Sequence, residues 1–237
     1  MFTIIKSAER GFADRGWLKS YHTFSFAVYH NPKRMSFGPL RVINEDWING
    51  GEGFPTHPHQ NMEIITYIVS GSLSHSDSTG TEASIHPGDA QRMSAGTGIR
   101  HSEFNHFNDK VTHLLQIWIV PDKAGYKPSY QQISFANNLA TGKMFLIASN
   151  DGRGGTVSMN QDVNLYALKS SNAGEHKTTI HKDRMLWLQV VSGEVTLDGE
   201  TVLTEGDAGA ALTAKDSEIK ISWTPNSEFL FFDMIRV

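Results

Sequence analysis

The sequence contains no cysteine, and this absence limits its chemistry first. Disulfides and thiolate metal sites are excluded, so any transition metal must be bound by His, Asp or Glu. No stretch approaches the roughly 20 apolar residues that a membrane-spanning helix needs. The opening segment Met1–Ser7 also lacks the apolar run of a signal peptide. We therefore expect no membrane association and a cytoplasmic location.

An excess of positive charge is also missing. Lys and Arg number 21 against 25 Asp and Glu, the formal net charge is −4, and the basic residues form no stripe. Direct nucleic-acid binding is therefore not expected. The 237 residues are 39% hydrophobic, enough for a buried core, and their number suits two domains of about 100 to 120 residues each.

Strand-like segments dominate the sequence, and no long amphipathic helix stands out. The segments are rich in β-branched and aromatic residues, and short turn signals containing glycine and aspartate separate them. They are residues 62–69, 114–120, 185–191, 218–223 and 229–235. This pattern predicts an all-β protein, either a sandwich or a barrel.

One β pattern occurs twice along the chain. Val69-Ser70-Gly71 recurs as Val191-Ser192-Gly193, about 122 residues later. An aspartate-led turn and then a Gly-Asp pair follow each copy in the same order, at Asp77 and Gly88-Asp89 and again at Asp198 and Gly206-Asp207. Three matches in order predict two copies of one unit. We place them at residues 1–130 and 131–237, and expect the loose segment 149–155 to be a surface loop of the second.

Two pairs of polar side chains have the spacing of metal ligands. His57 and His59 are two residues apart, as are His101 and Glu103. Because residues i and i+2 of a strand share a face, two neighbouring strands could direct all four side chains into one small barrel. Three imidazoles and one carboxylate suit Fe(II), Mn(II), Ni(II), Cu(II) or Zn(II). The alternative is a polar barrel mouth of hydrogen-bonded histidines, in which every group would need a partner.

The remaining candidates are weaker. Glu63 shares face parity with His57 and His59, which makes it a possible supporting group beside the metal. In the second half, a shift of 122 residues aligns Thr179 with His57 and His181 with His59. One histidine does not form a site, so we expect the second copy to be structural. For the other histidines we expect packing or surface roles. They are His22, His30, His75, His86, His106, His113, His176 and His181.

Two motifs carry a resemblance to known proteins. Gly51-x5-His57-x-His59-x3-Glu63 resembles the first cupin motif, and Gly96-x-Gly98-x2-His101-x3-Asn105 is similar to the second. Further segments resemble the pirins, and specifically bacterial pirin-like proteins with quercetin 2,3-dioxygenase activity. These segments are residues 15–18, 22–26, 37–38, 40–42, 44, 57–59, 62–63 and 93–103.

The resemblance implies two cupin (jelly-roll) domains in one chain, with metal only in the N-terminal domain. It carries over His57, His59, His101 and Glu103 as ligands, and does not carry over Glu63. The expected ion is Fe(II), with Ni, Cu, Mn or Zn as alternatives. The implied reaction opens the central ring of flavonols such as quercetin with O2 and releases carbon monoxide, with Glu103 as the general base.

Further residues and two rival functions remain open. Trp17, Phe24, Phe26 and Phe37 are candidates for a flavonol pocket, and Arg41 and Arg100 for anion contacts, although packing or solvated roles are the simpler explanation for each. One rival function is a metal-dependent interaction protein or transcriptional co-regulator. The other is a cupin enzyme for a different substrate. We expect a monomer, because two cupin units in one chain can mimic a cupin dimer.

Overall fold

A computed structural model describes residues 2–236 of the chain. Across that range the protein consists mainly of short β-strands, with a single four-residue α-helix, α1 (Ala136–Leu139). The predicted all-β class is confirmed. None of the helical turns in this range has the length and apolar character needed to cross a membrane.

The N-terminal unit contains two sheets. The strands of the first run in the order β12-β9-β6-β11-β4-β3-β2, and those of the second in the order β5-β10-β7-β8. The pairings among them are antiparallel, as a jelly roll requires. The strands of this unit are β2 (Gly11–Asp14), β3 (Leu18–His22), β4 (Leu40–Ile48), β5 (Gly53–His59), β6 (Glu63–Ser70), β7 (Leu73–Asp77), β8 (Glu82–Ile85), β9 (Asp89–Ser94), β10 (Ile99–Phe104), β11 (Thr112–Ile119), β12 (Ser129–Ser134) and β14 (Val157–Ser158).

The C-terminal unit repeats this plan. One sheet contains the order β1-β20-β17-β22-β15-β13, and the other has the order β16-β21-β18-β19. The four-strand order β20-β17-β22-β15 matches β9-β6-β11-β4, so the predicted sequence repeat is confirmed as a structural repeat. The strands are β1 (Thr3–Ile5), β13 (Phe145–Ser149), β15 (Val163–Ser170), β16 (Gly174–Ile180), β17 (Arg184–Ser192), β18 (Glu194–Leu197), β19 (Thr201–Thr204), β20 (Ala208–Leu212), β21 (Ser217–Trp223) and β22 (Ser227–Ile235).

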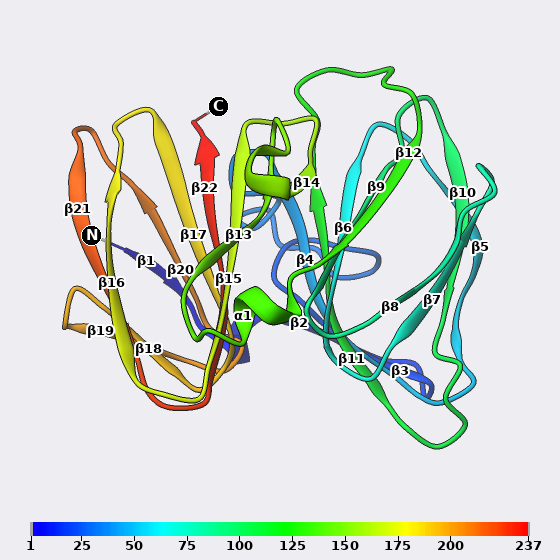
Figure 1. The fold of residues 1–237 in the computed structure, drawn as a ribbon, viewed down its shortest axis with the longest axis horizontal. Helices are drawn as coiled ribbons and strands as arrows, with labels where there is room; N and C mark the ends of the chain where they lie inside the picture. The colour runs from blue at the N-terminus through cyan, green and yellow to red at the C-terminus, as the bar shows by residue number, and fades with distance from the viewer. Residues whose placement is uncertain (1, 237) are drawn as a thin grey trace. The chain divides into compact units, whose positions relative to one another are not determined.

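The compact units differ from the predicted ranges 1–130 and 131–237 in that the boundary falls after Ser134, and in two further segments. The first residues, up to Glu9, belong to the C-terminal unit, because β1 pairs with β20. In Figure 1 this blue strand lies beside the orange β20. Residues 150–161 belong to the N-terminal unit, so the segment expected as a loop of the second copy is mostly a part of the first.

Hydrogen bonds explain this second assignment. Asn160 donates from its side chain to the Glu63 carboxylate, at 3.1 Å, and Ser158 offers its carbonyl oxygen to the Arg92 guanidinium, at 2.7 Å. The backbone N–H of Ser158 donates to the Gln131 side chain. These side chains are too far apart in sequence for local patterns to reveal the contacts.

The interior of the N-terminal unit is layered. One apolar cluster contains Ile68 and Leu114, and a second contains Ile64 and packs against Trp118. Between them, on the same faces of β6 and β11, lie Thr66 and Gln116, whose side chains are hydrogen-bonded at 3.1 Å. The two-residue strand period therefore places a buried polar layer between two apolar layers.

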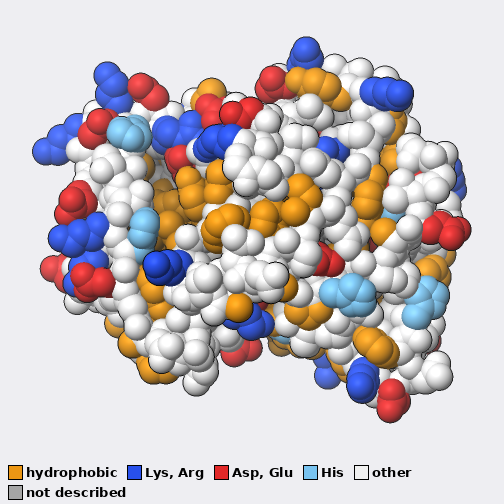
Figure 2. Space-filling model, viewed as in Figure 1, with side chains coloured by type: hydrophobic (Ala, Val, Ile, Leu, Met, Phe, Trp, Pro, Cys, Tyr) orange, Lys and Arg blue, Asp and Glu red, His pale blue; other side chains and the backbone are white. Residues whose placement is uncertain are grey.

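The C-terminal unit is apolar at the matching positions. In the N-terminal unit His101 pairs with His57, and β16 and β21 align Ile219 with Thr178 in the same way. Ile219 and Ile221 therefore stand where His101 and Glu103 stand, and both belong to a large buried apolar cluster. Outward positions of β16 and β21 carry charges of both signs, as Figure 2 shows, and include the exposed pair Lys220–Glu175.

Gly53 tests how closely β5 and β10 must approach. A Cβ atom at this position would lie 2.1 Å from the Glu103 carbonyl oxygen and 2.6 Å from the Phe104 Cα. Because backbone atoms cannot move aside cheaply, we expect Gly53→Ala to lower the free energy of unfolding by at least about 2 kcal/mol. Urea unfolding measures the change. Glu52→Ala, at the exposed neighbouring position, should shift it by less than about 0.5 kcal/mol. An equal effect of both variants would contradict this close approach.

Candidate metal centre

The strand β5 lies at the edge of its sheet, paired with β10 on one side. Pro55 and Pro58 lack a backbone N–H, and edge strands are where a sheet tolerates that loss. His57 and His59 flank Pro58 and are half-buried. The edge position therefore leaves one side of the two imidazoles accessible from outside the barrel.

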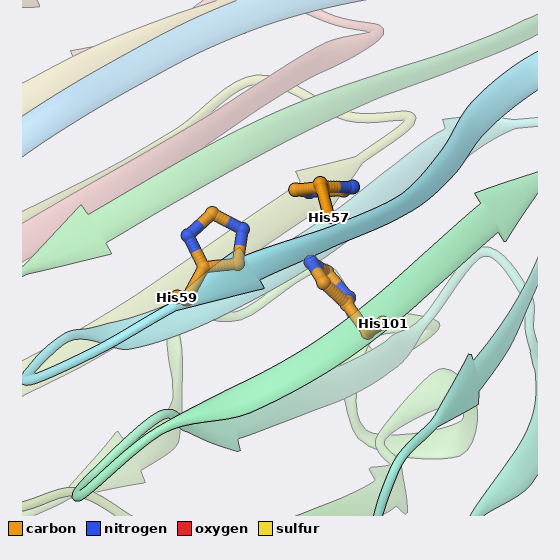
Figure 3. A group of neighbouring side chains, drawn as sticks. All are labelled: His57, His59 and His101. Carbon is orange, nitrogen blue, oxygen red and sulfur yellow. The ribbon is translucent and has the colours of Figure 1, made fainter.

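Three imidazoles converge in this region. Figure 3 shows the rings of His57 and His59, from β5, turned toward the ring of His101, from β10. The ring centroids are 4.8 Å apart for His57–His59, 4.5 Å for His57–His101 and 4.9 Å for His59–His101. One nitrogen from each ring can lie within 4.8 Å of the others, close enough for one ion to bind all three.

Glu103 does not belong to the group of three histidines. Its buried carboxylate accepts hydrogen bonds from the Gln116 amide, at 3.0 and 3.2 Å, and from the Thr66 hydroxyl, at 3.4 Å. It forms a second close group with His101 and His75. The pairing of β10 with β5 shifts register between His101 and Glu103, which places Glu103 opposite Phe54. Glu103 as the fourth ligand therefore stays a prediction.

Burial keeps two of the imidazoles neutral. Desolvation, followed by the neighbouring imidazoles, lowers the pKa of His59 to about 4 and that of His101 to about 3. A neutral ring has a free lone pair, whereas a protonated ring cannot bind a metal. At pH 7 the metal-free protein therefore already has these two imidazoles in the protonation state that metal binding requires.

Two hydrogen-bond observations show that the residues fit a metal. The Nδ1 of His57 lies 2.8 Å from the Pro55 carbonyl oxygen, so Nδ1 carries the proton and Nε2 keeps its lone pair. The Nε2 of His101 is buried and has no hydrogen-bond partner among residues 2–236. A bound cation would satisfy this atom.

The structure excludes Glu63 from the histidine group. Its carboxylate accepts hydrogen bonds from Ser94, at 2.8 Å, and from Asn160, and it belongs to neither close group found among residues 2–236. The parity argument fails because β5 ends at His59 and β6 begins at Glu63, and face parity does not continue through the intervening turn. The role suggested for Glu63 beside the metal is therefore not supported.

The other histidines differ in how deeply they are buried. His22 is buried and hydrogen-bonded to Asn44 at 2.9 Å, and burial lowers its pKa. His106 is exposed beyond the end of β10. His181 is exposed and bonded to Asp216, as expected, whereas His176 is half-buried and lines a cavity of about 230 Å³ in the C-terminal unit.

Aromatic side chains continue from the histidines. Trp118 lies edge-on to His59 with the ring centroids 4.9 Å apart, and Phe26 lies edge-on to Trp118 at 5.3 Å. Phe24 is buried, and Trp17 packs against an apolar core cluster. Of the four aromatics considered from the sequence, Phe26 is thus linked to the histidine group through Trp118. Trp17 is linked to it through Phe54, whose ring centroid lies 5.2 Å from that of Trp17 and 6.3 Å from that of His57.

Sequence reasoning missed three residues at the site. They are His75, Gln116 and Trp118. The inward parity of Gln116 and Trp118 on the predicted strand 114–120 was a usable signal. His75 precedes Asp77 at i, i+2 spacing, the same signal that marked His57 and His59.

The chain matches known proteins along its length. Residues 5–119 match the Pirin family model, and residues 146–234 match that of the quercetinase C-terminal cupin domain. Quercetin 2,3-dioxygenase of Escherichia coli strain K12 is 44% identical over 236 residues, and the match covers 99% of both chains. The chain belongs to the pirin family. Each of the two cupin domains of this pirin matches one of the two family models.

Solved structures agree. YhhW from Escherichia coli superposes on this pirin with a TM-score of 0.94 at 42% identity, covering 100% of this chain and 99% of that one. A second structure of that protein, a bacterial pirin in complex with nickel(II), gives a TM-score of 0.93 at 42% identity and covers 100% of both chains. A quercetin 2,3-dioxygenase from Acinetobacter baumannii, 19% identical with a TM-score of 0.79 and covering 98% and 85%, shares the fold.

Asp46 is a buried carboxyl of this barrel with a strongly raised pKa. It is fully buried, its Oδ1 has no hydrogen-bond partner among residues 2–236, and desolvation, with smaller contributions from Glu103 and Glu45, raises its pKa to about 7. The folded state therefore holds a proton that the unfolded chain releases near pH 4. This group favours folding below pH 4, and that contribution is lost as the pH rises to 7.

We expect Asp46→Asn to remove this pH dependence. In the metal-free protein, ionising Asp46 should cost up to about 4 kcal/mol of unfolding free energy between pH 4 and pH 8. Urea titrations across that range, with a chelator present, measure the slope. The variant should lose less stability over that range than the wild type, and Asp109→Asn, at an exposed position, should follow the wild type. An unchanged slope in Asp46→Asn would contradict the assignment.

Proposed function

We propose that this pirin is a metal-dependent dioxygenase that opens the central ring of flavonols such as quercetin with O2 and releases carbon monoxide. The observation that carries the proposal is the convergence of His57, His59 and His101 on one half-open point. A relative that is 44% identical over nearly the whole chain is a quercetin 2,3-dioxygenase, which supports the same reaction here.

The proposed ligands are the three imidazoles and the Glu103 carboxylate. The orphaned Nε2 of His101 and the free Nε2 of His57 support their assignment. Fe(II) is the proposed ion, and Ni is the best-supported alternative, since a relative binds nickel(II). A divalent ion at this position supplies Lewis acidity, which lowers the pKa of a coordinated hydroxyl group.

Glu103 is the proposed general base. Its carboxylate receives N–H and O–H donors from Gln116 and Thr66, which hold it in one orientation inside the barrel. A fixed, buried carboxylate that is still an acceptor can take the proton of the flavonol hydroxyl. Gln116 and Thr66 thereby position the base rather than touch the substrate.

The aromatic side chains beside His59 suit a planar polyphenol. Trp118 and Phe26 offer ring edges and faces next to the open side of the imidazoles. An open hollow of about 520 Å³ also reaches His59 and is lined in part by Ile99 and Arg100, but not by Trp118 or Phe26. Arg100 gives this hollow a positive charge, whereas Arg41 is bound to the Ser25 carbonyl oxygen.

The C-terminal unit is proposed to hold no metal. Its Ile219 and Ile221 occupy the positions of two ligands, and aliphatic side chains cannot bind an ion. Both close groups of possible metal-binding side chains among residues 2–236 lie in the N-terminal unit. A monomer with one metal per chain, without nucleic-acid partners, is the proposed working form.

The first variant tests the ligands. His101→Ala should remove at least about nine-tenths of the bound metal, because it deletes a donor that both neighbouring imidazoles face. Elemental analysis of the purified protein measures the content. His113→Ala, at a histidine bonded to Glu45, should keep the wild-type metal content. Undiminished metal in His101→Ala would refute the ligand assignment.

The second variant tests the base. Glu103→Gln keeps the size of the side chain but cannot accept the proton, so turnover should fall about a hundredfold or more while part of the metal remains. The assay follows the loss of quercetin absorbance in air, per bound metal. Normal turnover per metal in Glu103→Gln would show that Glu103 is not the base. Stoichiometric metal in an inactive wild type would instead favour the interaction-protein function.

A further inference from the structure

A fourth histidine, His75, lies inside the N-terminal barrel and is not among the proposed ligands. His75 and Asp77 are two residues apart on β7, so both point inward. Neither side chain has any exposed surface, and His75 Nε2 lies 2.9 Å from Asp77 Oδ2. Burying such a pair is costly unless each member is satisfied, so its presence calls for a function.

Strand pairing brings this pair to the candidate metal centre. In the register of β7 with β10, His101 is opposite Asp77 and Glu103 is opposite His75. The Nδ1 atoms of His75 and His101 lie 3.5 Å apart. The ring of Tyr130 packs at a tilt against His75, with the centroids 4.8 Å apart, and its hydroxyl donates to Gln132, which restricts the imidazole further.

The hydrogen bonds assign the protons. The Asp77 carboxylate can only accept, so when the His75 ring carries one proton, that proton lies on Nε2. His75 Nδ1 is then an acceptor, and the proton between the two rings belongs to His101 Nδ1. His101 Nε2 is left with its lone pair, and this is the atom that is buried without a partner among residues 2–236.

We infer that His75, held by Asp77, is a positioning residue that fixes the tautomer and ring orientation of His101 and so raises the affinity of the centre for a divalent metal. The inference rests on the proposed function. His57 has the corresponding support from the Pro55 carbonyl oxygen, so two ligands donate from Nδ1 and present Nε2. Partners of this kind are worth about tenfold to hundredfold in metal affinity.

The C-terminal unit supports the pairing of ligand and partner. In its register Leu197 stands opposite Ile221, at the position that His75 occupies opposite Glu103. Leu197, Ile219 and Ile221 belong to one buried apolar cluster. The copy that lacks the ligands thus also lacks the partner, as expected if the partner serves the ligand rather than the fold.

A direct ligand role for His75 fits less well, although His75, His101 and Glu103 form a close group. The Nε2 of His75 is committed to Asp77, and its Nδ1 faces the Nδ1 of His101 rather than the three-histidine point. A metal bound by both Nδ1 atoms would displace the proton that they share. It would also leave the buried Nε2 of His101 without a partner.

Three variants of the full chain separate these roles. His75→Leu removes both hydrogen bonds, whereas His75→Gln can still donate to Asp77 and accept from His101. His113→Leu is the matched control, because His113 also pairs with a buried carboxylate, that of Glu45, at 2.9 Å and stacks on Trp47. Affinity for Zn²⁺ and Ni²⁺ is measured by competition with a chromogenic chelator, and folding by thermal melting.

We expect His75→Leu to bind both ions ten to a hundred times more weakly, His75→Gln to stay within about threefold of wild type, and His113→Leu to match wild type in affinity. Wild-type affinity in His75→Leu would overturn the inference. Complete loss of metal in both His75 variants would overturn it in favour of a direct ligand. A wild type that binds neither ion would refute the proposed function instead.

The tautomers supply a test that needs no metal. In the metal-free protein, ¹⁵N NMR of the imidazoles should find the proton on Nδ1 of His101 and on Nε2 of His75, and His75→Leu should alter the His101 pattern. His101 protonated on Nε2 in the wild type would overturn the inference even if the affinities followed it.

Discussion

A polar group enclosed in a β-barrel must find its partner inside the barrel, and this constraint organises the N-terminal unit. Thr66, Gln116 and Glu103 form one hydrogen-bonded group in the polar layer, between apolar clusters above and below. Because an unpartnered buried group costs about 1–3 kcal/mol, each member restrains the next. The hydrogen bonds that satisfy the polar layer also hold the Glu103 carboxylate in a fixed orientation.

The two halves of the chain use one topology for different purposes. The C-terminal interior is aliphatic at the positions that correspond to His75, His101 and Glu103. Burying each Ile or Leu there stabilises the fold by roughly 1.5–3 kcal/mol. The N-terminal unit replaces those side chains with imidazoles and carboxylates, which contribute less to stability. It retains the apolar clusters around Ile68 and Ile64, so the centre stands between two layers that keep the barrel closed.

The strands give the three histidines of the candidate centre different degrees of burial. His57 and His59 lie on an edge strand with two prolines and remain half-exposed, whereas His101 lies on the neighbouring strand and is buried. The half-buried pair is partly accessible to solvent, whereas the buried ring of His101 contacts His75, which is hydrogen-bonded to Asp77. The lowered pKa values of His59 and His101 follow from this placement, since desolvation is the largest cause for both.

The sequence alone determined the β class and the repeat near 122 residues, and it predicted the two candidate ligand pairs, because strand periodicity and glycine turns are local and each pair lies within one strand. It did not reveal that His75 contacts His101. These residues are 26 positions apart in the sequence, and they meet only because β7 pairs with β10. Parity misplaced Glu63 because a turn resets it. Residues 150–161 belong to the N-terminal unit because of partners that are distant in sequence, such as Glu63 for Asn160. Contacts between strands are set by how the sheets assemble, and only the tertiary structure decides that.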